Sequence, residues 1–167
     1  MSIELIVLDV DGTMTNGQIT YTESGEELKS FCVKDGLAIA SWLKLGKHVA
    51  IITGRKSNIV ERRAMELGIE HFYQGVHQKQ EVLVKILDEL DLHWENVAVI
   101  GDDLNDSGML RSAGVSFAPA DASSYITRMV DEVLFCNGGE GAVREMIERL
   151  ILQEGLEEDF LTLWHYE

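Results

Sequence analysis

An apolar run ends in two carboxylates, a glycine and a hydroxyl at Leu5-Ile6-Val7-Leu8-Asp9-Val10-Asp11-Gly12-Thr13, near the start of the 167-residue sequence. Four consecutive apolar residues closed by Asp and Gly are typical of a central parallel strand, which is covered on both faces. In open α/β sheets the carboxyl ends of such strands face the ligand crevice. The stretch therefore predicts a buried strand that carries chemistry at its carboxyl end.

The two carboxylates of this stretch are close neighbours. Asp9 and Asp11 are two residues apart, so their side chains leave the same face while the chain stays extended, and Gly12 allows a sharp turn beyond them. Neighbouring carboxylates need a cation, a shared proton, or both. The alternative is that Asp-x-Asp-Gly is only a turn, because Asp and Gly are the commonest turn formers.

Length and charge limit the possible functions. A chain of 167 residues can bury one core but is too short for two ordinary enzyme domains, so we expect a single domain over residues 1–167. The start lacks the basic region of a signal peptide, and no apolar run reaches membrane-spanning length, which predicts a cytoplasmic protein.

The net charge of −15 disfavours nucleic acid and membranes as partners. An anionic substrate would therefore need a metal ion or a few placed Lys and Arg residues.

Apolar runs and glycine breaks alternate along the rest of the chain. Further strands are expected at residues 48–53, 71–73, 97–100, 115–118 and 133–135, and helices at 37–45, 58–67, 79–90, 105–113, 123–130 and 141–152. Asp35 is the expected N-cap of the first of these helices. Strands that alternate with helices of this length indicate an α/β fold with a doubly wound, Rossmann-like parallel sheet.

A β-hairpin is expected over about residues 17–33, where two segments that alternate in hydrophobicity flank Glu23-Ser24-Gly25-Glu26. It is inserted directly after the carboxylates, so it should project beside the active site like a flap, and the chain has no room for a separate cap domain. Apolar faces without cover mark an interface. Four apolar residues of the hairpin cannot all be buried by one small flap: Ile19, Tyr21, Leu28 and Phe31.

Polar groups lie at three further points along the chain, two of them after predicted strands and one at the start of a predicted helix. Thr53-Gly54-Arg55 follows the second strand, Lys79 begins a helix, and Gly101-Asp102-Asp103-Leu104-Asn105-Asp106 follows the third apolar strand of the sheet. Taken singly, these are a strand-end turn, a solvated lysine, and a cluster of acids that repel one another unless a cation is present. In this order after Asp9-Val10-Asp11-Gly12-Thr13, they resemble the four motifs of the haloacid dehalogenase superfamily of phosphotransferases.

The resemblance implies a Mg²⁺-dependent phosphatase and a role for each motif residue. Asp9 would be the nucleophile that forms an aspartyl-phosphate, and Asp11 would be the general acid and base. Thr53 would contact the phosphoryl oxygens, and Lys79 would offset their charge. Mg²⁺ would be held by Asp9, Asp102 and the backbone carbonyl of Asp11. Further roles are expected around the metal ion or Lys79 for Asp103 and Asp106, and in substrate binding for Thr13, Gly54, Arg55 and Asp35.

The similarity extends through the hairpin to Gly138-Gly139-Glu140-Gly141 and resembles the capless phosphatases of keto-deoxy sugar acid phosphates. It implies a homotetramer in which neighbouring subunits close the site. The resemblance implies 3-deoxy-D-manno-octulosonate 8-phosphate, a lipopolysaccharide precursor, as the substrate. Phosphatases of this octulosonate tend to have Arg after Thr/Ser-Gly, as Arg55 is here, where it can pair with the substrate carboxylate, whereas the nononate phosphatase has an acidic residue there. Two alternatives stay open: the nine-carbon 2-keto-3-deoxy-nononate 9-phosphate, and a non-catalytic oligomerisation module. The apolar tail over about residues 154–167 could dock on its own core or on a neighbour.

Overall fold

The sheet predicted from the apolar runs is present in the computed structural model, which describes residues 2–166. Its strands are β1 (Leu5–Leu8), β4 (His48–Ile52), β5 (His71–Tyr73), β6 (Val97–Ile100), β7 (Val115–Ala118) and β8 (Glu132–Val133). The six strands are ordered β5-β4-β1-β6-β7-β8, and every neighbouring pair is parallel. The predicted doubly wound parallel sheet is confirmed, and β1 lies between β4 and β6 at its centre.

The unbroken apolar run of β1 is explained by its two covered faces. Successive side chains of a strand point to opposite faces, and each face of β1 packs into a different hydrophobic cluster. Ile6 and Leu8 belong to one cluster, while Leu5 and Val7 belong to the other. All four side chains are fully buried. A strand with one solvated face would have alternated polar and apolar residues.

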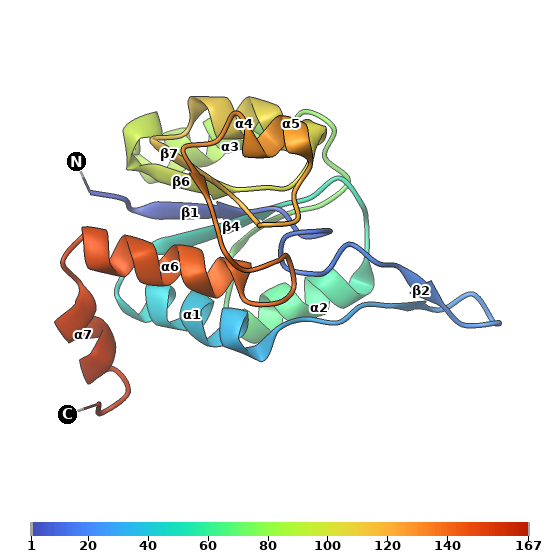
Figure 1. Ribbon diagram of the computed structural model, residues 1–167, viewed down its shortest axis with the longest axis horizontal. Coiled ribbons are helices and arrows are strands. Elements are labelled where there is room, and N and C mark those ends of the chain that lie inside the picture. The colour runs from blue at the N-terminus through green and yellow to red at the C-terminus, as the bar shows by residue number, and fades with distance from the viewer. Residues whose placement is uncertain (1, 167) are drawn as a thin grey trace.

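Helices cover both faces of the sheet (Figure 1). On one side lie α1 (Val33–Lys44), α2 (Asn58–Leu67) and α6 (Ala142–Gln153), and on the other lie α3 (Lys79–Leu90), α4 (Ser107–Ser112) and α5 (Ser124–Thr127). Two short 3₁₀ helices, η1 (Trp94–Asn96) and η2 (Leu104–Asp106), precede β6 and α4. The predicted bounds of α2 and α3 are confirmed. The helix expected at 123–130 is shorter, and the strand expected at 133–135 lies instead at Glu132–Val133.

The predicted start of the first helix is wrong. We expected this helix at 37–45 with Asp35 as its N-cap, but α1 begins at Val33 and Cys32 holds the N-cap position. The buried Asp35 accepts a hydrogen bond from the backbone N–H of Arg144, at 2.9 Å, in the first turn of α6. Its carboxylate therefore caps a neighbouring helix, a partner 109 residues away that local sequence does not reveal.

The predicted hairpin is present, with shorter strands than expected. β2 (Thr20–Tyr21) and β3 (Glu27–Leu28) pair antiparallel and form a separate two-stranded sheet that projects beyond the body of the molecule (Figure 1). The chain turns at Gly25, whose φ is +89°, a left-handed conformation that glycine adopts without steric cost. After β3 the chain returns to the body, where the half-buried Phe31 packs on the core.

The C-terminal tail packs on the body of its own chain. The tail contains α7 (Glu157–Thr162), whose Phe160 is buried in the cluster formed with α1 and α6. Beyond it, the indole nitrogen of Trp164 donates to Ser41 of α1 at 3.0 Å. Of the two docking positions left open by the sequence, the structure shows the intramolecular one. Within residues 2–166, no helix is long and apolar enough to cross a membrane.

Candidate active site

Three neighbouring strands end at one edge of the sheet and deliver the predicted motif residues there. Because β4, β1 and β6 are adjacent and parallel, the residues after Ile52, Leu8 and Ile100 meet at this edge. They surround a crevice of about 200 Å³. Its lining consists of Asp9, Asp11, Thr53, Gly54, Arg55, Asp102, Asp103 and Asn105. The structure thus brings together most of the predicted site, and it adds Asn105, which the sequence analysis did not single out.

The loop after β1 is held in a tight turn by the side chain of one of its residues, Thr15. The hydroxyl of Thr15 accepts hydrogen bonds from the backbone N–H groups of Gly12 and Gly17, each at 3.2 Å. Gly12 has a φ of +92°, and a Cβ at this position would overlap the carboxylate of Asp102. The turn therefore requires glycine both for its left-handed conformation and for the close approach of Asp102.

A second glycine segment, Gly138-Gly139, packs against the backbone of this loop. The N–H of Gly139 donates to the carbonyl of Thr13 at 3.0 Å, and a Cβ on Gly138 would overlap the carbonyl oxygen of Gly12. In the sequence, these glycines belong to the segment that resembles the sugar acid phosphate phosphatases. Their contacts show that they allow two backbone segments to pack closely beside the crevice.

Lys79 is buried between two carboxylates. Its Nζ lies 2.6 Å from Oδ1 of Asp9 and 2.7 Å from Oδ1 of Asp106, and its side chain is 1% exposed. A buried ammonium is stable only when it is paired and hydrogen-bonded. Taken by itself in the sequence, Lys79 fits a solvated surface lysine, and this interpretation is therefore wrong. Lys79 fixes the position of Asp9, which lines the crevice, and supplies positive charge next to it.

Asp9 and Asp102 form an acidic pair at the centre of the crevice. Burial raises the pKa of Asp9, and repulsion from Asp106 adds to this rise although Lys79 opposes it. Burial and the nearby charge of Asp9 likewise raise the pKa of Asp102. One oxygen from each of Asp9, Asp102 and Asp106 lies within 4.8 Å of the others. Carboxylate oxygens gathered at this spacing fit a hard divalent cation such as Mg²⁺.

Asp106 is already engaged in holding other residues. One of its oxygens accepts from Lys79, and the other accepts from the N–H groups of Asp102 and Asp103, at 3.0 and 3.3 Å. Asp103 accepts from the N–H of Leu104 and is the N-cap of η2. Asp106, rather than Asp103, therefore orients Lys79 within the described residues, and Asp9 and Asp102 are left to face the crevice.

Arg55 stands at the rim of the crevice, against the hairpin. Its guanidinium lies 3.4 Å from the hydroxyl of Tyr21 and 3.6 Å from Oε2 of Glu27, and its side chain is 44% exposed. Lys29 of the hairpin pairs with Asp11, a contact that the sequence analysis missed. The hairpin is thus tied to the crevice by two cations, and its position beside the site agrees with the flap prediction.

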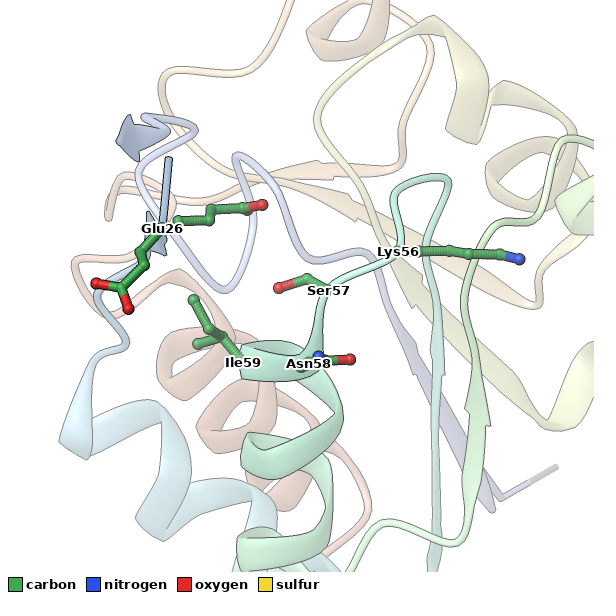
Figure 2. Close-up of a pocket in the computed structure, with 6 residues that line it drawn as sticks. Glu26, Lys56, Ser57, Asn58 and Ile59 are labelled. Atoms are coloured by element: carbon green, nitrogen blue, oxygen red, sulfur yellow. The ribbon is translucent and has the colours of Figure 1, made fainter. Parts of the chain in front are cut away.

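A larger depression lies between the hairpin and the start of α2 (Figure 2). It has a volume of about 420 Å³, and its walls include Glu26 and Glu27 from the hairpin, Ser57 at the N-cap of α2 and Ile59 of α2. The side chain of Lys56 points away from Glu26 in this view (Figure 2). The depression contains none of the clustered aspartates, so the smaller crevice is the candidate active site.

Two residues expected to bind substrate do not line the crevice. Thr13 is fully buried, and its hydroxyl oxygen has no hydrogen-bond partner within residues 2–166. Asp35 is buried at the start of α6, as described above, where Oδ2 likewise lacks a partner. The structure therefore places both beneath the surface, with Asp35 in the helix packing rather than at the substrate.

The burial of Asp35 predicts a pH-dependent contribution to stability. Burial raises the pKa of Asp35 from 3.8 to about 6, even though the N–H of Arg144 opposes the rise. Because the folded state binds this proton more tightly than the unfolded state, stability falls as pH rises from about 4 to about 6. Asp35→Asn removes this loss. We expect it to raise the free energy of unfolding by about 1 kcal/mol more at about pH 7.5 than at about pH 5.

Urea unfolding of wild type and Asp35→Asn at the two pH values measures this difference. Asp88→Asn, an exposed substitution on α3, is the control and should show no such change. A constant difference between Asp35→Asn and wild type at both pH values would contradict the prediction.

The sequence and the fold of this chain are similar to those of known phosphatases. The sequence profile of the haloacid dehalogenase-like hydrolase family matches residues 29–114. The 3-deoxy-D-manno-octulosonate 8-phosphate phosphatase of Salmonella typhi is 44% identical over 154 residues, which are 92% of this chain and 82% of that protein. The crystal structure of the enzyme of the same name from Yersinia pestis matches with a TM-score of 0.92 and 41% identity, over 93% of this chain and 84% of that chain.

A further structure carries ligands. The 3-deoxy-D-manno-octulosonate 8-phosphate phosphatase of Moraxella catarrhalis, in complex with a magnesium ion, a phosphate ion and a KDO molecule, matches with a TM-score of 0.94 and 37% identity, over 98% of this chain and 94% of that chain. Identity at this level across nearly whole chains, together with the profile match, establishes the relationship. The chain belongs to the haloacid dehalogenase-like hydrolase family.

Proposed function

We propose that this chain is a Mg²⁺-dependent phosphatase that hydrolyses 3-deoxy-D-manno-octulosonate 8-phosphate through an aspartyl-phosphate on Asp9. The observation that carries the proposal is the environment of Asp9, a buried carboxylate 2.6 Å from Lys79 that faces the crevice beside Asp102. The names of the most similar relatives support the substrate. We further propose that the protein works in the cytoplasm, on the route to bacterial lipopolysaccharide.

The first step transfers the phosphoryl group to the protein. A carboxylate oxygen of Asp9 attacks phosphorus, and the bond between phosphorus and the sugar oxygen breaks. The electron pair of that bond passes to the sugar oxygen, which takes a proton from Asp11. Thr53 and Gly54 line the crevice where the phosphoryl oxygens would lie. Lys79 holds Asp9 in place and offsets the negative charge that develops at phosphorus.

The second step releases phosphate. A water molecule gives a proton to Asp11 while its oxygen attacks phosphorus, and the bond between phosphorus and Asp9 breaks. Asp9 returns as a carboxylate, and Asp11 regains the proton that it gave to the sugar oxygen. The same residue thus acts as acid and then as base, which its place in the lining of the crevice allows.

The acidic pair requires a cation for an anionic substrate to approach. Asp9, Asp102 and the backbone carbonyl of Asp11 would hold Mg²⁺, which neutralises charge between the carboxylate nucleophile and the phosphate. Asp106 keeps Asp102 oriented by accepting from its backbone N–H. Removal of Mg²⁺ should therefore abolish phosphate release.

Arg55 is proposed to recognise the sugar acid. It follows Thr53-Gly54 at the rim and has an exposed guanidinium, which can pair with a carboxylate. We expect Arg55→Ala to lower kcat/KM on the sugar acid phosphate by about 10-fold or more. The loss should be much smaller on p-nitrophenyl phosphate, which has no carboxylate. Lys56→Ala, at the neighbouring exposed position, is the control and should resemble wild type on both substrates. Equal losses on the two substrates in Arg55→Ala would contradict carboxylate recognition.

A phosphate-release screen over sugar acid phosphates tests the proposed substrate. The eight-carbon 8-phosphate should be hydrolysed with the highest kcat/KM, and the nine-carbon 9-phosphate should be a poorer substrate. A reversed order would favour the nononate phosphatase alternative. Absence of phosphate release from every sugar acid phosphate would favour the non-catalytic module, although Asp9, Asp11, Lys79 and Asp102 are all present.

We propose that the protein is a homotetramer whose neighbouring subunits cover the hairpin and close the site. The support is the exposed apolar surface: Leu28 is 52% exposed on β3, and Val33 is 81% exposed at the start of α1. Apolar hairpin surface without cover in its own chain marks an interface. Closed symmetric assembly would also cover the edges of the two-stranded sheet.

Leu28→Glu should dissociate this assembly and lower activity on the sugar acid phosphate, because it buries a charge in the proposed interface. Light scattering of the purified protein gives the mass, and phosphate release gives the activity. Met65→Glu, an exposed substitution on α2, is the matched control. Two results would contradict the proposal: a wild type that is monomeric and fully active, or a monomeric Leu28→Glu variant that keeps full activity.

A further inference from the structure

Lys29 lies on the hairpin, outside the strand-end motifs, and its side chain is completely buried. Its Nζ donates to Oδ1 of Asp11 and lies 3.3 Å from Oε1 of Glu27. Asp11 lines the crevice and keeps 22% side-chain exposure, whereas Lys29 does not line the crevice. Lys29 therefore contacts Asp11 without occupying the space where a substrate would lie.

The pairing of Lys29 is enforced by its burial. A buried ammonium needs acidic partners, and within residues 2–166 the carboxylates that pair with Lys29 are Asp11 and Glu27. In the same range, Lys29 is the one hydrogen-bond partner of the Asp11 side chain. Without Lys29, the Asp11 carboxylate would be free to take other rotamers in the crevice.

The alternation of the hairpin explains how Lys29 reaches this position. Glu27 and Lys29 are two residues apart and point to the same face, whereas Leu28 points to the other. Tyr21 pairs with Glu27 across the hairpin, so it shares the inner face, where its hydroxyl meets Arg55. One face of the hairpin thus serves the crevice, and the opposite face carries the exposed Leu28.

We propose that Lys29 is the positioning residue for proton transfer by Asp11, an inference that rests on the proposed phosphatase function. Proton transfer requires the carboxyl group to lie within hydrogen-bond reach of the leaving oxygen. Lys29 restrains one oxygen of Asp11 and leaves the rest of the carboxyl group facing the crevice. The two neighbouring carboxylates of the loop after β1 are then held by separate cations, Asp9 by Lys79 from α3 and Asp11 by Lys29 from the hairpin.

Two phosphate esters with different leaving groups can distinguish a role of Lys29 in positioning Asp11 from a role in the general structure of the site. Phenoxide is a stronger base than p-nitrophenoxide, so it gains more from protonation as it leaves, whereas p-nitrophenoxide leaves with little help. Phenyl phosphate and p-nitrophenyl phosphate have the same ring and lack a sugar, so loss of sugar contacts affects neither. A defect in proton transfer therefore lowers kcat/KM mainly for phenyl phosphate.

The test compares wild type, Lys29→Met and Lys29→Arg on these two esters in the presence of Mg²⁺. We expect Lys29→Met to lower kcat/KM by about 10-fold to 10²-fold on phenyl phosphate, with a several-fold smaller loss on p-nitrophenyl phosphate. Lys29→Arg keeps a cation at this position and should recover a large part of the activity on phenyl phosphate. Lys34→Met replaces an exposed lysine of α1 and should match wild type on both esters.

Each outcome of this test bears on the proposal. Unequal losses with rescue by Lys29→Arg support the positioning role. Equal losses on the two esters, or no loss on any phosphate monoester that wild type hydrolyses, would overturn it while leaving the phosphatase function in place. A wild-type protein that releases phosphate from no monoester would overturn the proposed function, and the role of Lys29 with it.

Discussion

Replacement of Asp9 by Asn is expected to lower kcat by about 10⁴-fold or more, because a carboxamide is a poor nucleophile toward phosphorus. The fold should survive the change. Asn keeps the size of Asp and an oxygen that can accept from Lys79, which lies 2.6 Å from the Asp9 carboxylate. The substitution also removes a carboxylate whose pKa is raised by burial and by repulsion from Asp106, and whose charge helps to raise the pKa of Asp102. Stability should therefore change little.

Steady-state phosphate release and thermal unfolding measure these two quantities. A companion experiment traps the intermediate: acid-quenched wild-type enzyme is reduced with borohydride, which converts an acyl phosphate to an alcohol. Peptide mapping should then find this modification at Asp9 after incubation with substrate. Activity of Asp9→Asn within about 10-fold of wild type, or a modification at another carboxylate, would contradict the assignment of the nucleophile.

Replacement of Lys79 by Met should damage both catalysis and stability. Lys79 lies between Asp9 and Asp106, and its removal leaves two buried carboxylates without their cation. Breaking a buried ion pair by removing one partner commonly costs about 3 to 5 kcal/mol. In the proposed mechanism Lys79 also offsets charge at phosphorus, so its loss should lower kcat by about 10²-fold or more. Bound Mg²⁺ offsets part of the stability loss, so the largest destabilisation is expected in EDTA.

Urea unfolding with and without Mg²⁺, together with phosphate release, tests this prediction. Lys85→Met on the exposed side of the same helix is the matched control, since it removes a lysine without affecting the crevice. A Lys79→Met variant that unfolds at the same urea concentration as wild type in EDTA would show that Lys79 does not neutralise the acidic cluster.

The central sheet and the strand-end site could be predicted because both depend on local patterns. Four buried residues in a row distinguish a strand covered on both faces, as β1 shows. The parallel arrangement then brings the residues after β1, β4 and β6 to one edge. For this reason Asp9, Thr53 and Asp102 could be placed around one crevice before any distance was known.

The contacts that sequence reasoning missed join residues far apart in the chain. Lys29 of the hairpin pairs with Asp11 of the loop after β1, and Asp35 caps a helix that begins more than a hundred residues later. Gly138 packs against the carbonyl of Gly12. In each case the local pattern fits a common alternative: a hairpin lysine in solvent, an N-cap of the next helix, or a glycine in a connecting loop. Tertiary packing selects the partner, so periodicity and spacing do not reveal it.

Phosphate release from 3-deoxy-D-manno-octulosonate 8-phosphate, measured while Mg²⁺ is added to EDTA-treated protein, tests the central claim most directly. We expect no release without the metal ion, a saturable rise as Mg²⁺ is added, and no rise in Asp9→Asn or Asp102→Asn. Full activity in EDTA, or equal activity in either variant, would contradict a metal-assisted aspartyl-phosphate mechanism at this crevice.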